Sequence, residues 1–111
     1  MSNQKIRIEL TRDSNSTQKC PKGATASVHY TGKLPDGTVF DSSRPRGQPL
    51  DFKVGKGMVI PCWDLGIQQL TKGQQATLTC PPDTAYGSKG IRGVIPPNAT
   101  LIFDVELVNF R

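Results

Sequence analysis

The chain has 111 residues, of which 35% are hydrophobic and 21% are charged. This size and composition predict one globular domain over residues 1–111, able to bury a core without metal or disulfide support, and they exclude a disordered chain. The formal net charge of +5 is mild and the charges are scattered, so the sequence lacks the basic stripe that is typical of nucleic-acid binding.

The cysteines and the N-terminal sequence indicate the compartment. Cys20, Cys62 and Cys80 are odd in number and lack C-x-x-C spacing, a pattern typical of a reducing compartment, so we expect three reduced thiols. The N-terminal segment has no apolar stretch of the kind found in a signal peptide, and no stretch of the sequence is long enough to span a membrane. We therefore expect a cytoplasmic protein with no membrane partner, and the start at Met1 and the end at Arg111 suit a complete small protein.

The first half of the chain predicts strands. Ile6, Ile8 and Leu10 alternate with polar residues, as expected of a half-buried strand. A similar alternation resumes at Ala24, and a Pro-Asp-Gly sequence then favours a tight turn before the next apolar residues. Together these signals predict a hairpin over residues 24–41.

The second half predicts one short helix and two strands. A helical face is formed by apolar residues at i, i+3, i+7 and i+10, namely Ile60, Trp63, Ile67 and Leu70. Pro61 suits the first helical position, where its missing N–H costs nothing. Alternating apolar residues predict strands over residues 76–80 and 101–107, so we expect the α+β class, with a mostly antiparallel sheet and one helix packed on it.

Residues 81–100 form a long Gly- and Pro-rich connection between these last two strands. Loops of this length in compact domains are usually functional or disordered. This loop contains Tyr86, Ile91, Val94 and Ile95, which make it too apolar for a solvated linker. An apolar loop must cover something, and we interpret it as one wall of a pocket.

Conventional catalytic chemistry has little support in the sequence. His29 is the only histidine, and its position inside a predicted strand favours a structural or exposed role over that of a general base. Four zinc ligands with sensible spacing cannot be found, and the carboxylates show no pairing for acid–base work. We therefore expect no metal and no cofactor, and an apolar site with a few polar donors.

Four segments of the sequence resemble the FKBP family of peptidyl-prolyl isomerases. They are HYTGKLPDGTVFDSS at 29–43, VIPCWDLGIQQLTKGQ at 59–74, AYGSKG at 85–90 and IPPNATLIFDVELV at 95–108. The resemblance runs from about residue 22 to the C-terminus. It implies a five-stranded antiparallel sheet wrapped around a short helix, and a monomeric enzyme that accelerates rotation of X-Pro bonds during protein folding. It also implies binding of, and inhibition by, the macrolides tacrolimus and rapamycin.

The resemblance also implies a ligand site between helix and sheet. Trp63 would lie under the proline ring, and the Ile60 N–H and the Tyr86 hydroxyl would bind carbonyl groups of the ligand. The residues implied to act in catalysis are Tyr30, Asp41, Ile60, Trp63, Tyr86 and Phe103. Those implied to contact the peptide or macrolide are Phe40, Arg46, Leu50, Met58, Val59, Ile91 and Ile95. From patterning alone, Trp63 and Phe103 would instead be assigned to the core.

Four positions depart from the usual family pattern. Leu50 stands where an aromatic residue is common, Met58 where an acidic residue is frequent, and Ile91 where a histidine is often found. These changes alter the rim of the implied pocket and leave its centre intact. Cys62 stands where glycine is common, and two interpretations stay open: a reactive thiol at the start of the helix, or a small packed residue.

Two functions remain open at this level. The first is an enzyme that isomerises proline-containing peptides and proteins. The second is a binding module, in which the pocket docks a partner protein or a macrolide and turnover is incidental. A third, nucleic-acid binding, would require strongly salt-dependent association with DNA or RNA, and no motif in the sequence asks for it.

Overall fold

The computed structural model describes residues 6–111, so Met1 lies outside the described residues. Its strands are β1 (Arg7–Arg12), β2 (Thr25–Lys33), β3 (Val39–Ser42), β4 (Leu50–Lys53), β5 (Gln75–Cys80) and β6 (Leu101–Phe110). The α-helix of the described residues, α1, spans Pro61–Ile67, and two 3₁₀ turns cover Arg44–Arg46 and Pro82–Thr84.

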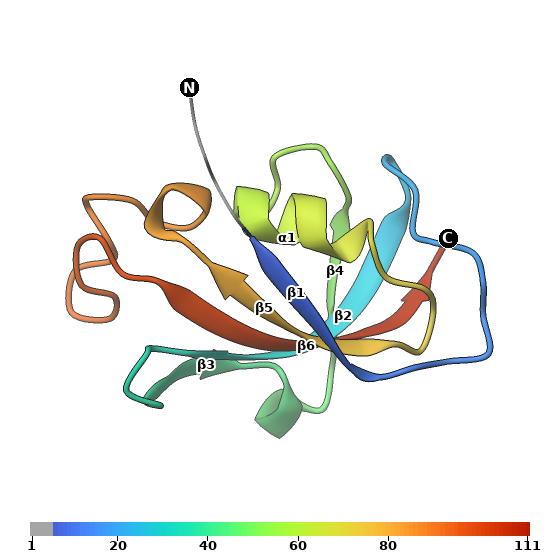
Figure 1. Cartoon of the computed structure of the whole chain (residues 1–111), viewed down its shortest axis with the longest axis horizontal. Helices are drawn as coiled ribbons and strands as arrows, with labels where there is room; N and C mark the ends of the chain where they lie inside the picture. The colour runs from blue at the N-terminus through green and yellow to red at the C-terminus, as the bar shows by residue number, and fades with distance from the viewer. Residues whose placement is uncertain (1–5) are drawn as a thin grey trace.

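The strands form one antiparallel sheet in the order β1-β5-β6-β2-β3, with β4 also paired to β2 (Figure 1). The first part of β2, including Ala26, pairs with β4, whereas its last part, including Gly32, pairs with β3. The two short strands therefore occupy successive stretches of the same edge of β2. This arrangement accounts for six strands where the resemblance implies five, and the α+β class is confirmed.

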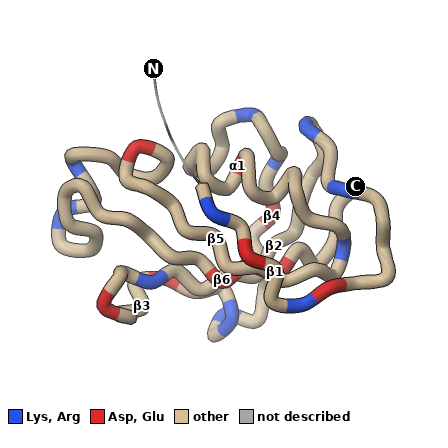
Figure 2. The backbone as a smooth tube through the Cα atoms, in the orientation of Figure 1, with Lys and Arg blue, Asp and Glu red and all other residues tan. Residues whose placement is uncertain are grey.

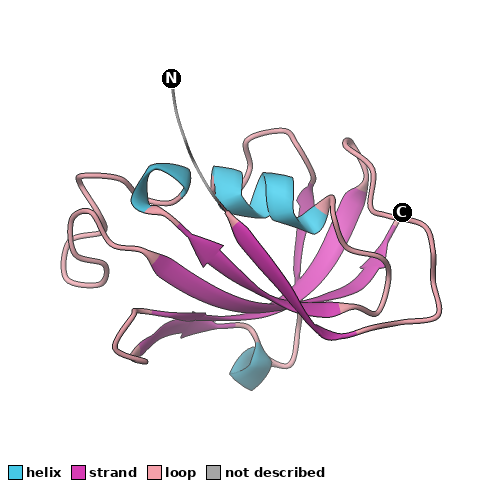
Figure 3. Cartoon of the chain, viewed as in Figure 1, coloured by secondary structure: helices cyan, strands magenta, loops and turns pink. Residues whose placement is uncertain are grey.

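Helix α1 lies across one face of the sheet and supplies part of the core (Figure 3). In β6, the side chains of Leu101, Phe103, Val105 and Leu107 are buried and that of Asp104 is exposed, as the alternation predicts. Gly66 allows α1 to approach the sheet closely, because a Cβ at this position would lie 3.0 Å from the Leu78 side chain.

The helix begins where the sequence predicts and ends earlier. Pro61 lies in its first turn, and the carbonyl of Ile60 accepts hydrogen bonds from the N–H groups of Trp63 and Asp64 at 2.9 and 3.2 Å. Because α1 ends at Ile67, Leu70 lies in the following turn. Leu70 is nevertheless fully buried, so the apolar pattern marked the core correctly and overestimated the length of the helix.

Two strands differ from the sequence predictions. Strand β1 was predicted to be half-buried, yet Ile8 and Leu10 are 38% and 49% exposed. The reason is its position at the edge of the sheet, where β5 is its only strand neighbour among the described residues. Strand β4 is missing from the sequence predictions although Leu50, Phe52 and Val54 alternate with Asp51 and Lys53, because the alternation spans only five residues.

Charged residues are distributed over the whole molecule. Figure 2 shows Lys and Arg on several loops and strands, interspersed with Asp and Glu. Lys33 and Asp104 form an ion pair at 3.1 Å, and Arg44 and Glu106 form another at 2.9 Å, each between solvent-accessible side chains. Within residues 6–111, the helices are too short and too polar to cross a membrane.

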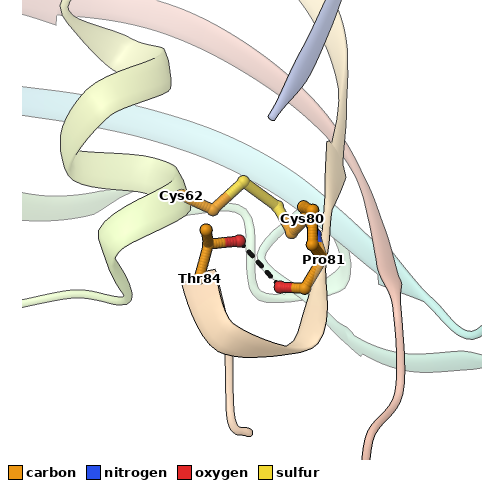
Figure 4. The surroundings of a disulfide bond; sticks show 4 residues. All are labelled: Cys62, Cys80, Pro81 and Thr84. Carbon is orange, nitrogen blue, oxygen red and sulfur yellow. Dashed lines mark hydrogen bonds between the residues drawn. A yellow bond between two sulfur atoms is a disulfide. The ribbon is translucent and has the colours of Figure 1, made fainter. Parts of the chain in front are cut away.

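The prediction of three reduced thiols is wrong. Cys62 and Cys80 form a disulfide with a Cα–Cα distance of 5.7 Å, and only Cys20 is a free thiol (Figure 4). The two residues are separated by 18 positions, so no local motif indicated the pairing. They meet because the first turn of α1 packs against the C-terminal end of β5.

We expect reduction of the Cys62–Cys80 bond to lower the free energy of unfolding by about 2–4 kcal/mol, because the cross-link restricts the unfolded chain. For a domain of this size, the corresponding fall in melting temperature is roughly 10–20 °C. Calorimetry with and without a phosphine reductant measures it. The Cys20→Ala variant is the control and should keep the full reductant effect. An unchanged melting temperature after complete reduction would contradict the expectation.

Candidate active site

A cleft of about 250 Å³ lies between the first turn of α1 and the sheet. The loops before α1 and after β5 complete its sides. Its lining residues are Tyr30, Phe40, Asp41, Leu50, Met58, Val59, Ile60, Trp63, Tyr86 and Phe103. These come from segments that are distant in the sequence, and the fold brings them together.

Aromatic rings form the floor and one wall of the cleft. The ring centroid of Trp63 lies 4.9 Å from that of Tyr30 and 5.3 Å from that of Phe103, both edge to face. Phe40 packs edge to face on Phe103 at 5.7 Å. Such pairs stabilise each other beyond simple area burial. The Trp63 indole N–H is buried and has no hydrogen-bond partner among the described residues.

A polar network closes the cleft on the β3 side. The Tyr30 hydroxyl donates a 2.7 Å hydrogen bond to Asp41 Oδ2, and Arg46 Nη2 donates one of 3.2 Å to the Tyr30 oxygen. Arg46 Nη1 lies 3.5 Å from Asp41 Oδ1 and donates to the Ser42 carbonyl at 3.0 Å. Burial, and then the hydrogen bond to Asp41, raises the pKa of Tyr30, which therefore stays a neutral donor at physiological pH.

Two donors on the opposite side make no hydrogen bond within the described residues. The backbone N–H of Ile60 precedes the first turn of α1 and is one of them. The other is the hydroxyl of Tyr86, whose side chain is 38% exposed at the mouth of the cleft. Burial raises the pKa of Tyr86, so this hydroxyl also stays protonated. Both groups are available to carbonyl oxygens of a ligand.

The loop that carries Met58 and Val59 is fastened to the helix by one carboxylate. Asp64 in α1 accepts the N–H of Gly55 at 2.9 Å with Oδ1 and the N–H of Gly57 at 3.0 Å with Oδ2. This double acceptor fixes the path of the chain into Ile60. The helix thereby positions the loop side of the cleft as well as its floor.

Three of the residues that the resemblance implies do not line the cleft. Arg46 lies behind Tyr30 and Asp41, and acts on the cleft through them. Ile91 and Ile95 pair with each other across a small turn of the 81–100 loop, and Ile95 is buried whereas Ile91 is 37% exposed. Neither isoleucine lines the cleft, although Ile95 belongs to the same buried cluster as Trp63 and Phe103.

Sequence reasoning missed two residues that support the cleft. Ser43 is fully buried, and its hydroxyl oxygen accepts the Tyr30 N–H at 2.9 Å and lies 2.8 Å from His29 Nδ1. Gly32 provides room for the wall, because a Cβ there would lie 2.6 Å from Phe40 and 2.8 Å from Phe103. A buried serine and a strand glycine carry no signal in a single sequence that distinguishes them from ordinary residues.

Comparison with known proteins identifies the class. Residues 16–108 match the family described as FKBP-type peptidyl-prolyl cis-trans isomerase. The chain therefore belongs to the FKBP-type peptidyl-prolyl cis-trans isomerases.

Several individual proteins of this class are similar to the chain. It is 62% identical over 86 residues to the peptidyl-prolyl cis-trans isomerase Fkbp12 of Drosophila melanogaster, covering 78% of the chain and 80% of that protein. It is 48% identical over 106 residues to the isomerase FKBP1A of Xenopus laevis, covering 96% and 98%. It is 60% identical over 93 residues to the FK506-binding protein 2 of Yarrowia lipolytica; this match covers 84% of the chain and only 65% of that longer protein.

We expect Gly32→Ala to weaken peptide binding several-fold, because the added methyl group displaces the Phe40 and Phe103 rings that form the wall. Weaker binding should appear as a higher KM for a proline-containing test peptide. Val39→Ala, at an exposed position of the neighbouring strand, is the matched control and should leave KM unchanged. A Gly32→Ala enzyme with unaltered KM would show that the ring positions do not matter.

The ionisation of Tyr30 can be measured directly, because the chain has only two tyrosines. In a Tyr86→Phe background, we expect phenolate absorbance to develop above the ordinary tyrosine pKa of about 10, and Asp41→Asn to move it to lower pH. The unfolded state ionises first, so the stabilising contribution of Tyr30 is constant below about pH 10 and is lost as pH rises towards the folded pKa. Titration at the ordinary value would contradict the burial of this hydroxyl.

Proposed function

We propose that this isomerase accelerates rotation of X-Pro bonds in peptides and folding proteins. The bond would rotate in the cleft above Trp63, with the proline ring packed on the indole. The observation that carries the proposal is the combination of an aromatic floor with two donors, at Ile60 and Tyr86, that make no hydrogen bond within residues 6–111. A proline ring suits the apolar floor, and the flanking peptide carbonyls suit the donors.

The chemistry needs no acid, base or nucleophile. A peptide bond resists rotation by roughly 18–20 kcal/mol because its C–N bond has partial double-bond character, and uncatalysed X-Pro isomerisation takes tens to hundreds of seconds. The planar amide is strongly polarised and is stabilised by water, whereas the twisted amide has lost much of its charge separation. A cleft that replaces water by aromatic rings therefore disfavours the planar form more than the twisted form.

Hydrogen bonds to the flanking carbonyls hold the twist. If the Ile60 N–H fixes a carbonyl on one side of the proline, the part of the peptide on the other side can rotate against it. Contacts that are stronger in the twisted state than in either planar isomer lower the barrier. In this account Tyr30 and Asp41 supply the polar wall, and Arg46 holds both in place.

We also propose that the same cleft binds macrolides such as tacrolimus and rapamycin. Its rim exposes large apolar side chains, with Leu50 38% and Met58 61% exposed, and these offer contact area to a ligand larger than a proline ring. Ile91, which is 37% exposed, would contact only an extended ligand, whereas Ile95 is buried. We further propose that the chain acts as a monomer, since one chain supplies the whole cleft.

We propose a cytoplasmic location. In that compartment, disulfides are rare, and those that form are usually transient and redox-sensing. A cytoplasmic protein with the Cys62–Cys80 bond would thus exist in two redox forms.

Replacing Trp63 tests the proposed function. We expect Trp63→Ala to lower kcat/KM for a chromogenic X-Pro tetrapeptide by about tenfold or more, because the floor under the proline is lost. Since Trp63 is also a core residue, Trp63→Phe, which keeps an aromatic floor, should retain the fold with an intermediate loss. Leu65→Ala, on the exposed face of the same helix, should be unaffected. Unchanged isomerisation in a folded Trp63→Ala protein would refute the proposal.

A further inference from the structure

The Cys62–Cys80 disulfide joins two segments that each contribute to the cleft, the first turn of α1 and the loop after β5. Figure 4 shows the bond running from the start of α1 to the end of β5, beside the turn that contains Thr84. Both cysteines are fully buried. The bond is therefore internal, and its position relative to the cleft decides what it can influence.

On the helix side, Cys62 lies between two groups of the site. Ile60 carries the backbone N–H that makes no hydrogen bond within the described residues, and Trp63 forms the floor of the cleft. The helix has only seven residues, so anchoring Cys62 to the sheet fixes the first turn and both neighbours with it. Asp64, in the same turn, passes this constraint to the loop that carries Met58 through its bonds to two backbone N–H groups.

On the sheet side, Cys80 is the last residue of β5 and opens the 81–100 loop. The next residues form a tight 3₁₀ turn, in which Thr84 Oγ1 and N–H both bond the Pro81 carbonyl, at 2.7 and 2.9 Å. The Gly87 N–H returns to the Pro82 carbonyl at 2.8 Å. Tyr86 lies within this short, internally bonded segment, so the anchor at Cys80 also fixes the base from which Tyr86 reaches the cleft.

We propose that Cys62 and Cys80 are a redox-active positioning pair: the disulfide holds the helix side and the Tyr86 side of the cleft in the ligand-binding arrangement, and its reduction by a dithiol loosens them. This inference rests on the proposed function of the cleft. Neither cysteine lines the cleft, so both act through Ile60, Trp63 and Tyr86.

The redox step is a thiol–disulfide exchange. One thiolate of a dithiol reductant attacks either Cys62 or Cys80, their S–S bond breaks, a mixed disulfide forms, and the leaving thiolate takes up a proton. The second thiolate of the reductant then attacks the mixed disulfide and releases the other cysteine as a thiol. The pair gains two electrons and two protons, and the reductant becomes a disulfide.

Burial of the two sulfurs determines how a reductant reaches them and how ligand binding affects their reduction. Because the sulfurs are buried, exchange requires a local opening of the first turn of α1 or of the Pro82–Thr84 turn. A ligand that contacts Ile60, Trp63 and Tyr86 holds both closed and should slow reduction. The two effects are linked. If the disulfide raises ligand affinity by some factor, bound ligand shifts the equilibrium between the reduced and disulfide forms towards the disulfide by the same factor.

Tacrolimus binding and peptide turnover, each measured on the oxidised and the reduced protein, test the proposal. Mass spectrometry confirms the redox state, and the assay temperature lies well below both melting points. We expect reduction to weaken tacrolimus binding and to lower kcat/KM by on the order of fivefold or more. Saturating tacrolimus should also shift the thiol–disulfide equilibrium with dithiothreitol towards the disulfide. The factor should equal the ratio of the tacrolimus dissociation constants of the reduced and oxidised proteins. A bond that only stabilises the fold would produce no such shift.

Variants separate this pair from other effects of the reductant. Cys62→Ser with Cys80→Ser should match the reduced protein and be insensitive to reductant, whereas Cys20→Ala should remain sensitive. If the double variant does not fold, the reduced wild-type protein and the single Cys80→Ala variant supply the comparison.

Each remaining outcome is decisive. Equal tacrolimus affinity and kcat/KM in the two redox forms would overturn the proposal and leave the bond as a stabilising cross-link. Absence of the bond after air oxidation of the purified protein would overturn it as well. An oxidised protein that neither binds tacrolimus nor turns over the peptide would instead refute the proposed function.

Discussion

The indole ring of Trp63 lies within 4.9 Å of the Tyr30 ring and 5.3 Å of the Phe103 ring, at the point where the first turn of α1 meets β2 and β6. The helix is short, so these aromatic contacts, together with the Cys62–Cys80 bond, fix its start on the sheet. The same contacts place the Ile60 N–H at one side of the cleft. A ring that seals the core is thus also the floor of the site, and the packing that stabilises the fold determines the geometry available to a ligand.

The surrounding polar groups serve that apolar floor. Tyr30 remains neutral because its surroundings disfavour the phenolate, and it directs its proton to Asp41. Arg46 closes the network from behind. These groups keep the wall fixed without providing an acid or base for covalent chemistry, and this agrees with a reaction whose barrier is the loss of amide conjugation. In the proposed mechanism, the site works by excluding water and by positioning the peptide.

Periodicity made much of the fold predictable, and it could not assign the site. The alternation in β6 and the Pro-Asp-Gly hairpin reflect burial on one face of a sheet, which a single sequence records directly. Trp63 and Phe103 satisfy the same rule as core residues, so only the resemblance to a family marked them as functional. Contacts between distant segments remained invisible: the Cys62–Cys80 bond depends on how α1 lies against β5, and the exposure of Leu10 depends on its place at the sheet edge.

We propose above all that an X-Pro bond rotates while its proline ring packs on the indole of Trp63. Nuclear magnetic resonance tests this directly. Trp63 is the only tryptophan, so its indole N–H gives a single signal in ¹⁵N-labelled protein. Titration with a proline-containing peptide should move this signal and that of the Ile60 N–H most. Exchange cross-peaks between the cis and trans forms of the peptide should appear at the same time. Shifts confined to the β1 edge or to the loop around Lys89, with the indole signal unmoved, would contradict the account.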